Sequence, residues 1–199
     1  SKFRPRCSCP VRSMSQAERN ANDGMSLLQT AEGAMNEVGG ILTRMRELAV
    51  QASSETIDDT QRGYIGDEFG ALQSEIDRIG AVTEYNGTTL LDGTADVDVQ
   101  VGINNAIGND RITINTQDGN IAALALNANV VNTATSAQAA IDAIDTALDT
   151  VNTSRSDYGA AQNSLSSALH NLESYTENLV AAESRIRDVD FAAETADMT

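Results

Sequence analysis

The chain has 199 residues, a formal net charge of −16, 4% aromatic residues and no tryptophan. A surface this acidic repels phosphate backbones, and no run of about 18 apolar residues is present, so we expect neither a nucleic-acid partner nor a membrane span. Leucine, isoleucine, valine, alanine and methionine must build the core, which favours closely packed helices over a thick β-sandwich.

The first fourteen residues differ from the rest and are predicted to be an atypical or disordered leader. They contain both prolines and both cysteines, Cys7 and Cys9. A closed zinc site needs four ligands, and the only histidine, His170, is remote in the sequence. We therefore expect no metal and no cofactor. Because the remaining chain lacks cysteine, no disulfide framework is expected either.

A first helix is predicted from Ser15 to Ser53, where apolar residues recur in steps of three and four. Ser15 and Glu18 could form a capping box at its start. Glycines within this stretch cost a helix about 1 kcal/mol each, and we expect them to permit close packing rather than to break the helix. The apolar track is Leu28, Ala31, Met35, Val38, Leu42, Met45, Ala49 and Ala52, and the glycines are Gly24, Gly33, Gly39 and Gly40.

A turn with several N-cap candidates separates this helix from a second one, predicted at residues 59–82. The dipeptide Asn86-Gly87 then signals a turn. After it the apolar period changes to two, which predicts a β-hairpin over residues 96–116. The apolar residues of the second helix are Ile65, Phe69, Leu72, Ile76 and Ile79, and those of the hairpin are Val97, Val99, Val101, Ile103, Ile112 and Ile114.

A loosely packed connector is predicted at 117–136, followed by a long helix at 137–183 and a charged tail at 184–199. The helix carries a 3-4 apolar track that is polar at Arg155, Gln162 and Thr176. About 50 helical residues span roughly 75 Å, which is longer than a compact domain requires. The track contains Ile141, Ile144, Leu148, Val151, Tyr158, Leu165, Leu169, Leu172, Leu179 and Ile186.

These patterns predict a mainly α fold. We expect one domain over residues 15–199, an elongated coiled-coil-like bundle of two long helices and a shorter one, with one β-hairpin. No Ser-His-Asp constellation and no glycine-rich phosphate loop can be placed. His170 is explained as a residue at the edge of the apolar track of its helix, which we call the seam. We therefore predict that the chain is not an enzyme.

Three stretches resemble the conserved ends of bacterial flagellin. Two of them resemble the N-terminal conserved region of that family: QAERNANDGMSLLQTAEGAMNEVGGILTRMRELAVQASS and EIDRIGAVTEYNGTTLLDG. The third resembles its C-terminal conserved region: RSDYGAAQNSLSSALHNLESYTENLVAAESRIRDVDFAAE. Together they cover residues 12–94 and about 145–199. The resemblance implies a rod-like inner domain in which the two long helices are antiparallel, and export through the flagellar secretion apparatus. It also implies assembly with other subunits into a helical filament, the filament cap as a further partner, and a role in motility. The expected location is the extracellular flagellar filament.

The chain also departs from that family. Residues 1–10 are not expected to belong to its pattern, and the family's terminal helices are expected to be missing, which predicts a monomer in solution. The short connector leaves no room for variable outer domains. A hook–filament junction protein is the alternative, although the RELAVQ and DFAxE stretches favour flagellin.

The flagellin family contains a surface recognised by vertebrate Toll-like receptor 5. By resemblance the matching residues are Arg44, Leu48 and Glu68, with Leu42, Arg46 and Gln51 nearby. Arg44, Leu48 and Gln51 follow at i, i+4 and i+7, which places them along one helical ridge. The alternative is that Leu48 only flanks the core and Arg44 pairs with an acid of its own bundle.

Overall fold

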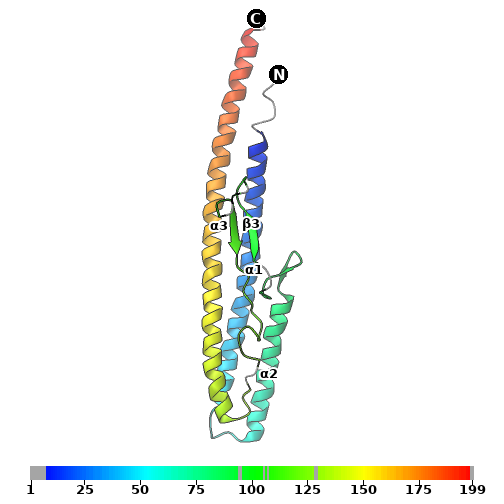
Figure 1. Cartoon of the computed structure of the whole chain (residues 1–199), viewed down its shortest axis with the longest axis vertical. Coiled ribbons are helices and arrows are strands. Elements are labelled where there is room, and N and C mark those ends of the chain that lie inside the picture. Colours follow the sequence, from blue (N-terminus) through cyan, green and yellow to red (C-terminus); the bar gives the residue numbers. More distant parts are fainter. Residues whose placement is uncertain (1–7, 94–95, 105, 107, 128–129, 198–199) are drawn as a thin grey trace. The chain divides into compact units, whose positions relative to one another are not determined.

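The fold is mainly α, as predicted. A computed structural model describes residues 8–93, 96–104, 106, 108–127 and 130–197. In this part of the chain there are three helices and two small strand pairs (Figure 1). The helices are α1 (Ser8–Ala52), α2 (Asp59–Val82) and α3 (Ala134–Asp197), and the strands are β1 (Glu84–Tyr85), β2 (Thr88–Thr89), β3 (Val97–Gln100) and β4 (Arg111–Ile114).

Contacts within the chain group it into two compact units, whereas one domain was expected over residues 15–199. Unit 1 combines the chain up to Ser26, the segment Asp98–Thr113 and the chain from Ala161 onward. Unit 2 combines Leu27–Val97 and Ile114–Ala160. Helices α1 and α3 therefore contribute residues to both units, and each unit has its own packing.

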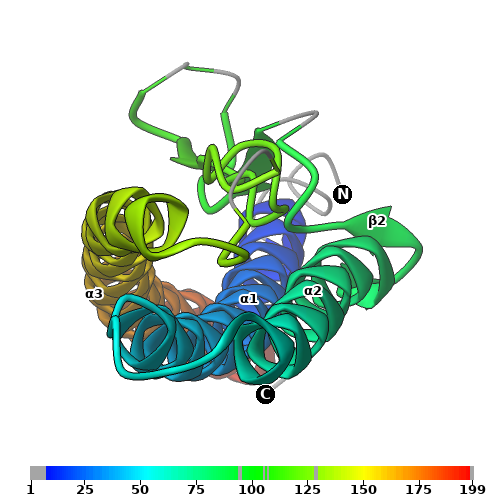
Figure 2. The ribbon, with the colours of Figure 1, turned by 90° about the horizontal axis from the view of Figure 1, so that it is seen from below.

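Unit 2 is built on the predicted apolar tracks. All eight track residues of α1 from Leu28 to Ala52 are buried, because a 3-4 spacing puts them on one helical face. The later five of them, from Val38 to Ala52, share one core with Ile65, Phe69 and Ile76 of α2 and with Ile144 and Val151 of α3. Viewed along the helices, α1 lies between α2 and α3 (Figure 2).

Within unit 2, α1 and α3 run antiparallel. Arg46 of α1 contacts Asp145 of α3, and a Cβ placed on Gly39 would lie 3.7 Å from Val151. The contacted residue number on α3 thus rises as the number on α1 falls. This is the antiparallel orientation that the resemblance implied.

The connector between β4 and α3 packs tightly, so the prediction of loose packing was wrong. Ile121, Leu124, Leu126 and Val131 are buried in the core of unit 2. Several hydrogen bonds hold it on the helices: Gln73 donates to the carbonyl of Leu126, the amide of Ile121 donates to Asp77, and the amide of Gln117 donates to the Tyr158 hydroxyl. The residues in these contacts are distant in sequence, so the local spacing of apolar residues does not predict them.

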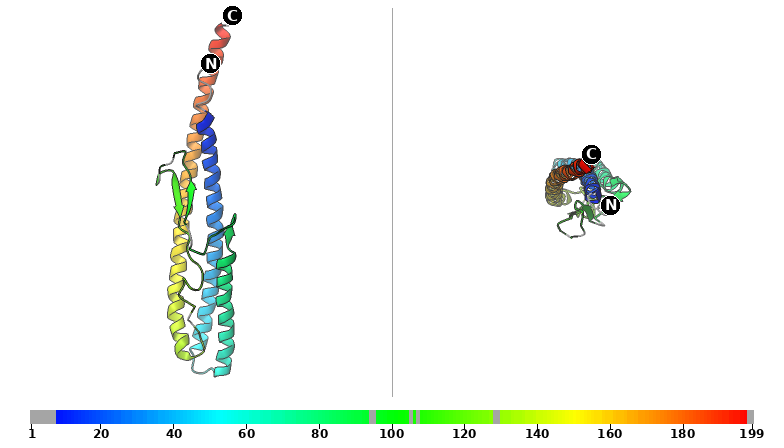
Figure 3. Two further views of the ribbon diagram at one scale, coloured as in Figure 1. Left: turned by 45° about the vertical axis from the view of Figure 1, so that its right-hand side comes forward. Right: turned by 90° about the horizontal axis from the view of Figure 1, so that it is seen from above.

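Unit 1 pairs the N-terminal part of α1 with the later part of α3 and with the β3–β4 hairpin. Met14 and Ala17 pack on Leu172, with Leu179 alongside. The strands of the hairpin lie side by side (Figure 3), joined across by hydrogen bonds from Thr113 to Asp98 and from Arg111 to Gln100. A hydrogen bond from Asn20 to the carbonyl of Gln100 ties the hairpin to α1.

Three predicted boundaries differ from those observed. Helix α1 already begins at Ser8, so residues 8–14 of the predicted leader are helical and the capping box at Ser15 and Glu18 was wrong. Helix α3 starts at Ala134 and continues through the predicted tail to Asp197. Residues 1–7 of the leader, with Cys7, and the side chain of the seam residue Ile186 lie outside the described residues.

A second, smaller hairpin was not predicted. The expected turn at Asn86-Gly87 joins β1 to β2, which pair antiparallel with Glu84 opposite Thr89. Asn86 and Gly87 have φ values of 51° and 79°, the left-handed pair that a two-residue hairpin turn requires. The turn was therefore read correctly, but strands of two residues are too short to show a period.

Candidate functional site

The exposed side of the α1–α2 pair carries a network of charges centred on Arg44. The Nε and Nη2 groups of Arg44 donate to one oxygen of Glu68 on α2, at 3.1 and 2.9 Å, and Nη1 donates to Glu47 at 2.9 Å. Hydrogen bonds to Glu47 and Glu68 raise the pKa of Arg44. About half of each side chain of the Arg44–Glu68 pair is exposed, at 51% and 47%.

A second ion pair joins α1 to α3 nearby. Arg46 donates from Nε and Nη2 to the two oxygens of Asp145, at 2.6 and 3.2 Å. This two-pronged geometry raises the pKa of Arg46 and lowers that of the Asp145 carboxyl, chiefly through the hydrogen bonds. Gln51, the last polar residue of the predicted surface, is exposed on the following turns of α1.

The two leucines of the predicted surface are buried. Leu48 is 2% exposed and Leu42 is fully buried, and both belong to the core of unit 2. The apolar face of α1 is wide here, because the helix packs on both α2 and α3 and buries the consecutive residues Leu48 and Ala49. The placement of Leu48 off the seam was therefore wrong, since it belongs to the core rather than flanking it, and Arg44 pairs with acids of its own bundle as the alternative held.

Sequence reasoning missed the arginine that closes the α1–α2 turn. Arg62 is 4% exposed and donates to the carbonyls of Ala52, Ser54 and Ile57. Asp58 caps the start of α2 by accepting from the amide of Gln61, which confirms a predicted N-cap. One sequence signal was available for Arg62, since it lies three residues before Ile65 on the apolar track of α2.

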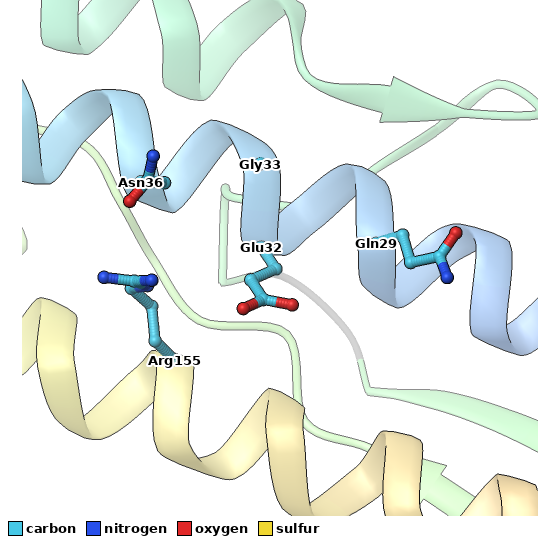
Figure 4. Close-up of a pocket in the computed structure, with 5 residues that line it drawn as sticks. All are labelled: Gln29, Glu32, Gly33, Asn36 and Arg155. Carbon is cyan, nitrogen blue, oxygen red and sulfur yellow. The ribbon is translucent and has the colours of Figure 1, made fainter.

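An open polar pocket of about 360 Å³ lies between α1 and α3 within unit 2, and three of its five lining residues are exposed. Its lining is Gln29, Glu32, Gly33 and Asn36 of α1 and Arg155 of α3 (Figure 4). The side chains of Glu32 and Arg155 extend toward the opposite helix. The Nε of Arg155 is buried and has no hydrogen-bond partner. Arg155 is one of the three polar positions noted on the α3 track.

The described residues hold no group of three or more histidine, cysteine or acidic residues suited to a metal ion. None of the helices found there has an apolar stretch long enough to cross a bilayer. The charged side chains on the surface of α1 form ion pairs with one another and are exposed to solvent. They do not point together into an enclosed pocket. Such a surface is suited to contacts with another macromolecule.

Seam-packed helices with exposed polar faces define this chain as an α-helical structural protein. Two family models match it: the bacterial flagellin N-terminal helical region over residues 7–96 and the bacterial flagellin C-terminal helical region over 141–199. The chain belongs to the bacterial flagellin family, whose members are structural components of the flagellar filament and not enzymes. The first match begins at residue 7, so the expectation that residues 1–10 stand outside the family pattern was too broad.

Individual relatives agree with this assignment. A flagellin of Halalkalibacterium halodurans is 47% identical over 192 residues, which cover 95% of this chain and 70% of the relative. The crystal structure of Bacillus cereus flagellin superposes with a TM-score of 0.69 at 32% identity, over 83% of this chain and 94% of that one. A putative flagellar hook-associated protein from Vibrio parahaemolyticus has a TM-score of 0.73 at 14% identity, over 90% and 93% of the two chains, and shares the fold alone.

Proposed function

We propose that this flagellin is exported through the flagellar secretion apparatus and added beneath the cap to a growing extracellular filament. Family membership at both ends of the chain is the observation that carries this proposal. Copies of one chain that join through different surfaces make a contact that does not close, and such contacts generate a helix rather than a ring. The outward polar faces of α1, α2 and α3 supply side chains for those contacts.

Filaments sheared from the bacterium test this role. If the chain is the filament subunit, its peptides dominate the mass spectrum of the purified filaments. A hook–filament junction protein, the alternative that shares the fold, would be a trace component found at the filament base. A filament made mainly of another protein would contradict the proposal and favour the junction role.

We also propose that vertebrate Toll-like receptor 5 recognises the exposed charges of the α1–α2 surface. Arg44 and Glu68 would make the central contacts, with Arg46 and Gln51 at the edge. Their exposure supports this reading, because a partly exposed guanidinium can exchange an intramolecular acid for an acceptor on the receptor. Leu42 and Leu48 would contribute indirectly, because their packing in the core holds α1 and its surface residues in position.

The receptor proposal is tested by the affinity of the purified chain for the receptor ectodomain. We expect Arg44→Ala and Glu68→Ala each to weaken binding by about tenfold or more, since central arginines and their partners often cost at least 1–2 kcal/mol when truncated. Surface plasmon resonance would measure the change, and circular dichroism would verify that each variant keeps its helix content.

Arg78→Ala is the matched control. Arg78 is an exposed arginine of α2 that pairs with Glu75 one turn earlier, outside the proposed surface. It should bind as the parent chain does. Unchanged affinity in both Arg44→Ala and Glu68→Ala would remove the proposed receptor surface.

A further inference from the structure

The turn between β1 and β2 carries Asn86-Gly87, the only asparagine–glycine pair in the 199 residues. Both residues are exposed to solvent. Asparagine is among the chemically labile residues of proteins. Its side-chain amide carbon can be attacked by the main-chain nitrogen of the next residue, and glycine hinders that attack least because it lacks a Cβ. The pair is therefore a candidate for spontaneous modification.

Hydrogen bonds do not restrain the two reacting groups of this turn. Within the described residues, the Asn86 side chain has no hydrogen-bond partner and the Gly87 amide donates to no carbonyl. A Cβ built on Gly87 would meet nothing within 4 Å, so the turn is open on that side. Asn109 is also exposed, but the amide of the next residue, Asp110, donates to the carbonyl of Ala106 at 3.0 Å. The nitrogen that would attack Asn109 is thus held in place, whereas that of Gly87 is not.

The closed turn opposes the reaction, but few contacts keep it closed. With φ values of 51° and 79°, Asn86 and Gly87 form the left-handed pair of a two-residue hairpin, and ring closure requires a rotation of the main chain away from it. Strands β1 and β2 have two residues each, and so short a ladder is marginal in water. The hydrogen bond from the Leu90 amide to the Thr83 carbonyl fixes the base of the hairpin. The tip can therefore open locally while the helices stay folded.

We propose that Asn86 is a site of spontaneous deamidation in the folded chain. The Gly87 nitrogen attacks the side-chain amide carbon of Asn86, a five-membered cyclic imide forms, and the amide group leaves as ammonia with the proton of the attacking nitrogen. Water then opens the ring at either carbonyl. The products are aspartate, with an ordinary main chain, and isoaspartate, whose main chain runs through the former side chain. Each product adds one negative charge to the hairpin tip, and isoaspartate also adds one carbon atom to the main chain of the turn.

Incubation of the purified, folded chain at mildly alkaline pH under reducing conditions tests the proposal. Peptide mapping by mass spectrometry measures the modified fraction at each asparagine, and an isoaspartyl methyltransferase labels the isoaspartate product. In water enriched in heavy oxygen, the product should gain one heavy oxygen atom. Asn86 should be modified at least about tenfold faster than the asparagines of α1 and α3, because opening a packed helix costs more free energy than opening the hairpin tip.

Glu37→Gly is the matched control. It places a glycine directly after Asn36, at two exposed positions within α1, and so creates the same dipeptide in a helix. There the attacking nitrogen donates to the carbonyl four residues earlier. Circular dichroism verifies that the helix persists. In the folded variant Asn36 should be modified at least about tenfold more slowly than Asn86, and the two rates should become similar when guanidinium chloride unfolds the chain.

Two results would overturn the proposal. One is an unmodified Asn86 in the folded chain under conditions in which the unfolded chain reacts, because the hairpin would then protect the site. The other is an equal rate at Asn36 and Asn86 in the folded Glu37→Gly variant, because the open turn would then not be what makes Asn86 reactive.

Discussion

At the scale of single residues, four arginines of unit 2 divide by burial. Arg44, Arg46 and Arg78 form ion pairs in which both side chains are largely exposed. Pairs of this kind contribute little to stability, because water and salt screen them. Arg62 is buried and donates to the main-chain carbonyls of Ala52 and Ser54 at the α1–α2 turn. Its removal should therefore have a much larger effect.

We expect Arg62→Ala to lower the free energy of unfolding by about 3 kcal/mol, because it removes a buried side chain that donates to three main-chain carbonyls, one of them in a buried hydrogen bond. Urea denaturation followed by circular dichroism measures this change. Arg78→Ala, an exposed arginine on the same helix, should stay within about 0.5 kcal/mol of the parent chain. Equal losses in the two variants would show that Arg62 is no more important than a surface residue.

The Arg46–Asp145 pair makes a prediction about pH. The hydrogen bonds from Arg46 lower the pKa of Asp145 below its ordinary value of 3.8. The folded state therefore binds this proton less tightly than the unfolded chain, so the pair stabilises the fold above pH 3.8 and loses that effect as the pH falls through the folded pKa. Carboxyl NMR titration should show a low midpoint for Asp145 that returns toward 3.8 in Arg46→Gln; an unchanged midpoint would contradict the pairing.

Residue roles were only partly predictable from the sequence. The spacing of Arg44 and Gln51 correctly placed them off the seam, but Leu48 was misplaced because α1 has two packing partners at this level. A single helix pattern does not show how many neighbours a helix has. The partner of Arg62 was not predictable either, since it consists of main-chain carbonyls.

At the scale of the elements, the seven-residue tracks predicted the three helices and most of the buried face of each. The predicted and observed bounds of α2 are both 59–82, where Asp58 supplies a cap. The ends of α1 and α3 were missed, because composition rather than periodicity was used to judge residues 8–14 and 184–197. We expected all four glycines of the α1 track region to permit close packing, but in the structure only some of them have a close neighbour.

Gly24 and Gly40 show this difference. A Cβ on Gly24 would lie 3.0 Å from Val99 of the hairpin, so this glycine permits a close approach. A Cβ on Gly40 would meet nothing within 4 Å. Gly40→Ala should therefore stabilise the chain by about 0.5–1 kcal/mol, because alanine restricts the unfolded chain and favours the helix.

Thermal unfolding would measure the effect, with Gly24→Ala as the comparison. The latter should gain less or lose stability, since Val99 and Leu165, whose nearest atom lies 3.3 Å from the added Cβ, must give way. A larger gain at Gly24 than at Gly40 would contradict the contacts described for the hairpin.

At the scale of the whole molecule, the sequence predicted the class of fold but not its division into two units. The α3 track runs from Ile141 in unit 2 to Leu179 in unit 1, so the apolar period does not mark where one unit ends and the other begins. The connector also escaped prediction, because Ile121 and Leu126 become buried only through contacts with helices far away in the sequence. The candidate surface was found by resemblance to flagellins, and its ion pairs became visible only in the structure.

We propose that the aliphatic faces of the helices are buried inside each subunit and that copies meet through their polar faces. Electron cryomicroscopy of filaments built from this chain tests that statement most directly. We predict that Leu42, Ile76 and Leu165 face the interior of their own subunit in every copy, with contacts between copies made by exposed side chains. Filaments in which these three residues pack against a neighbouring copy instead would contradict the account.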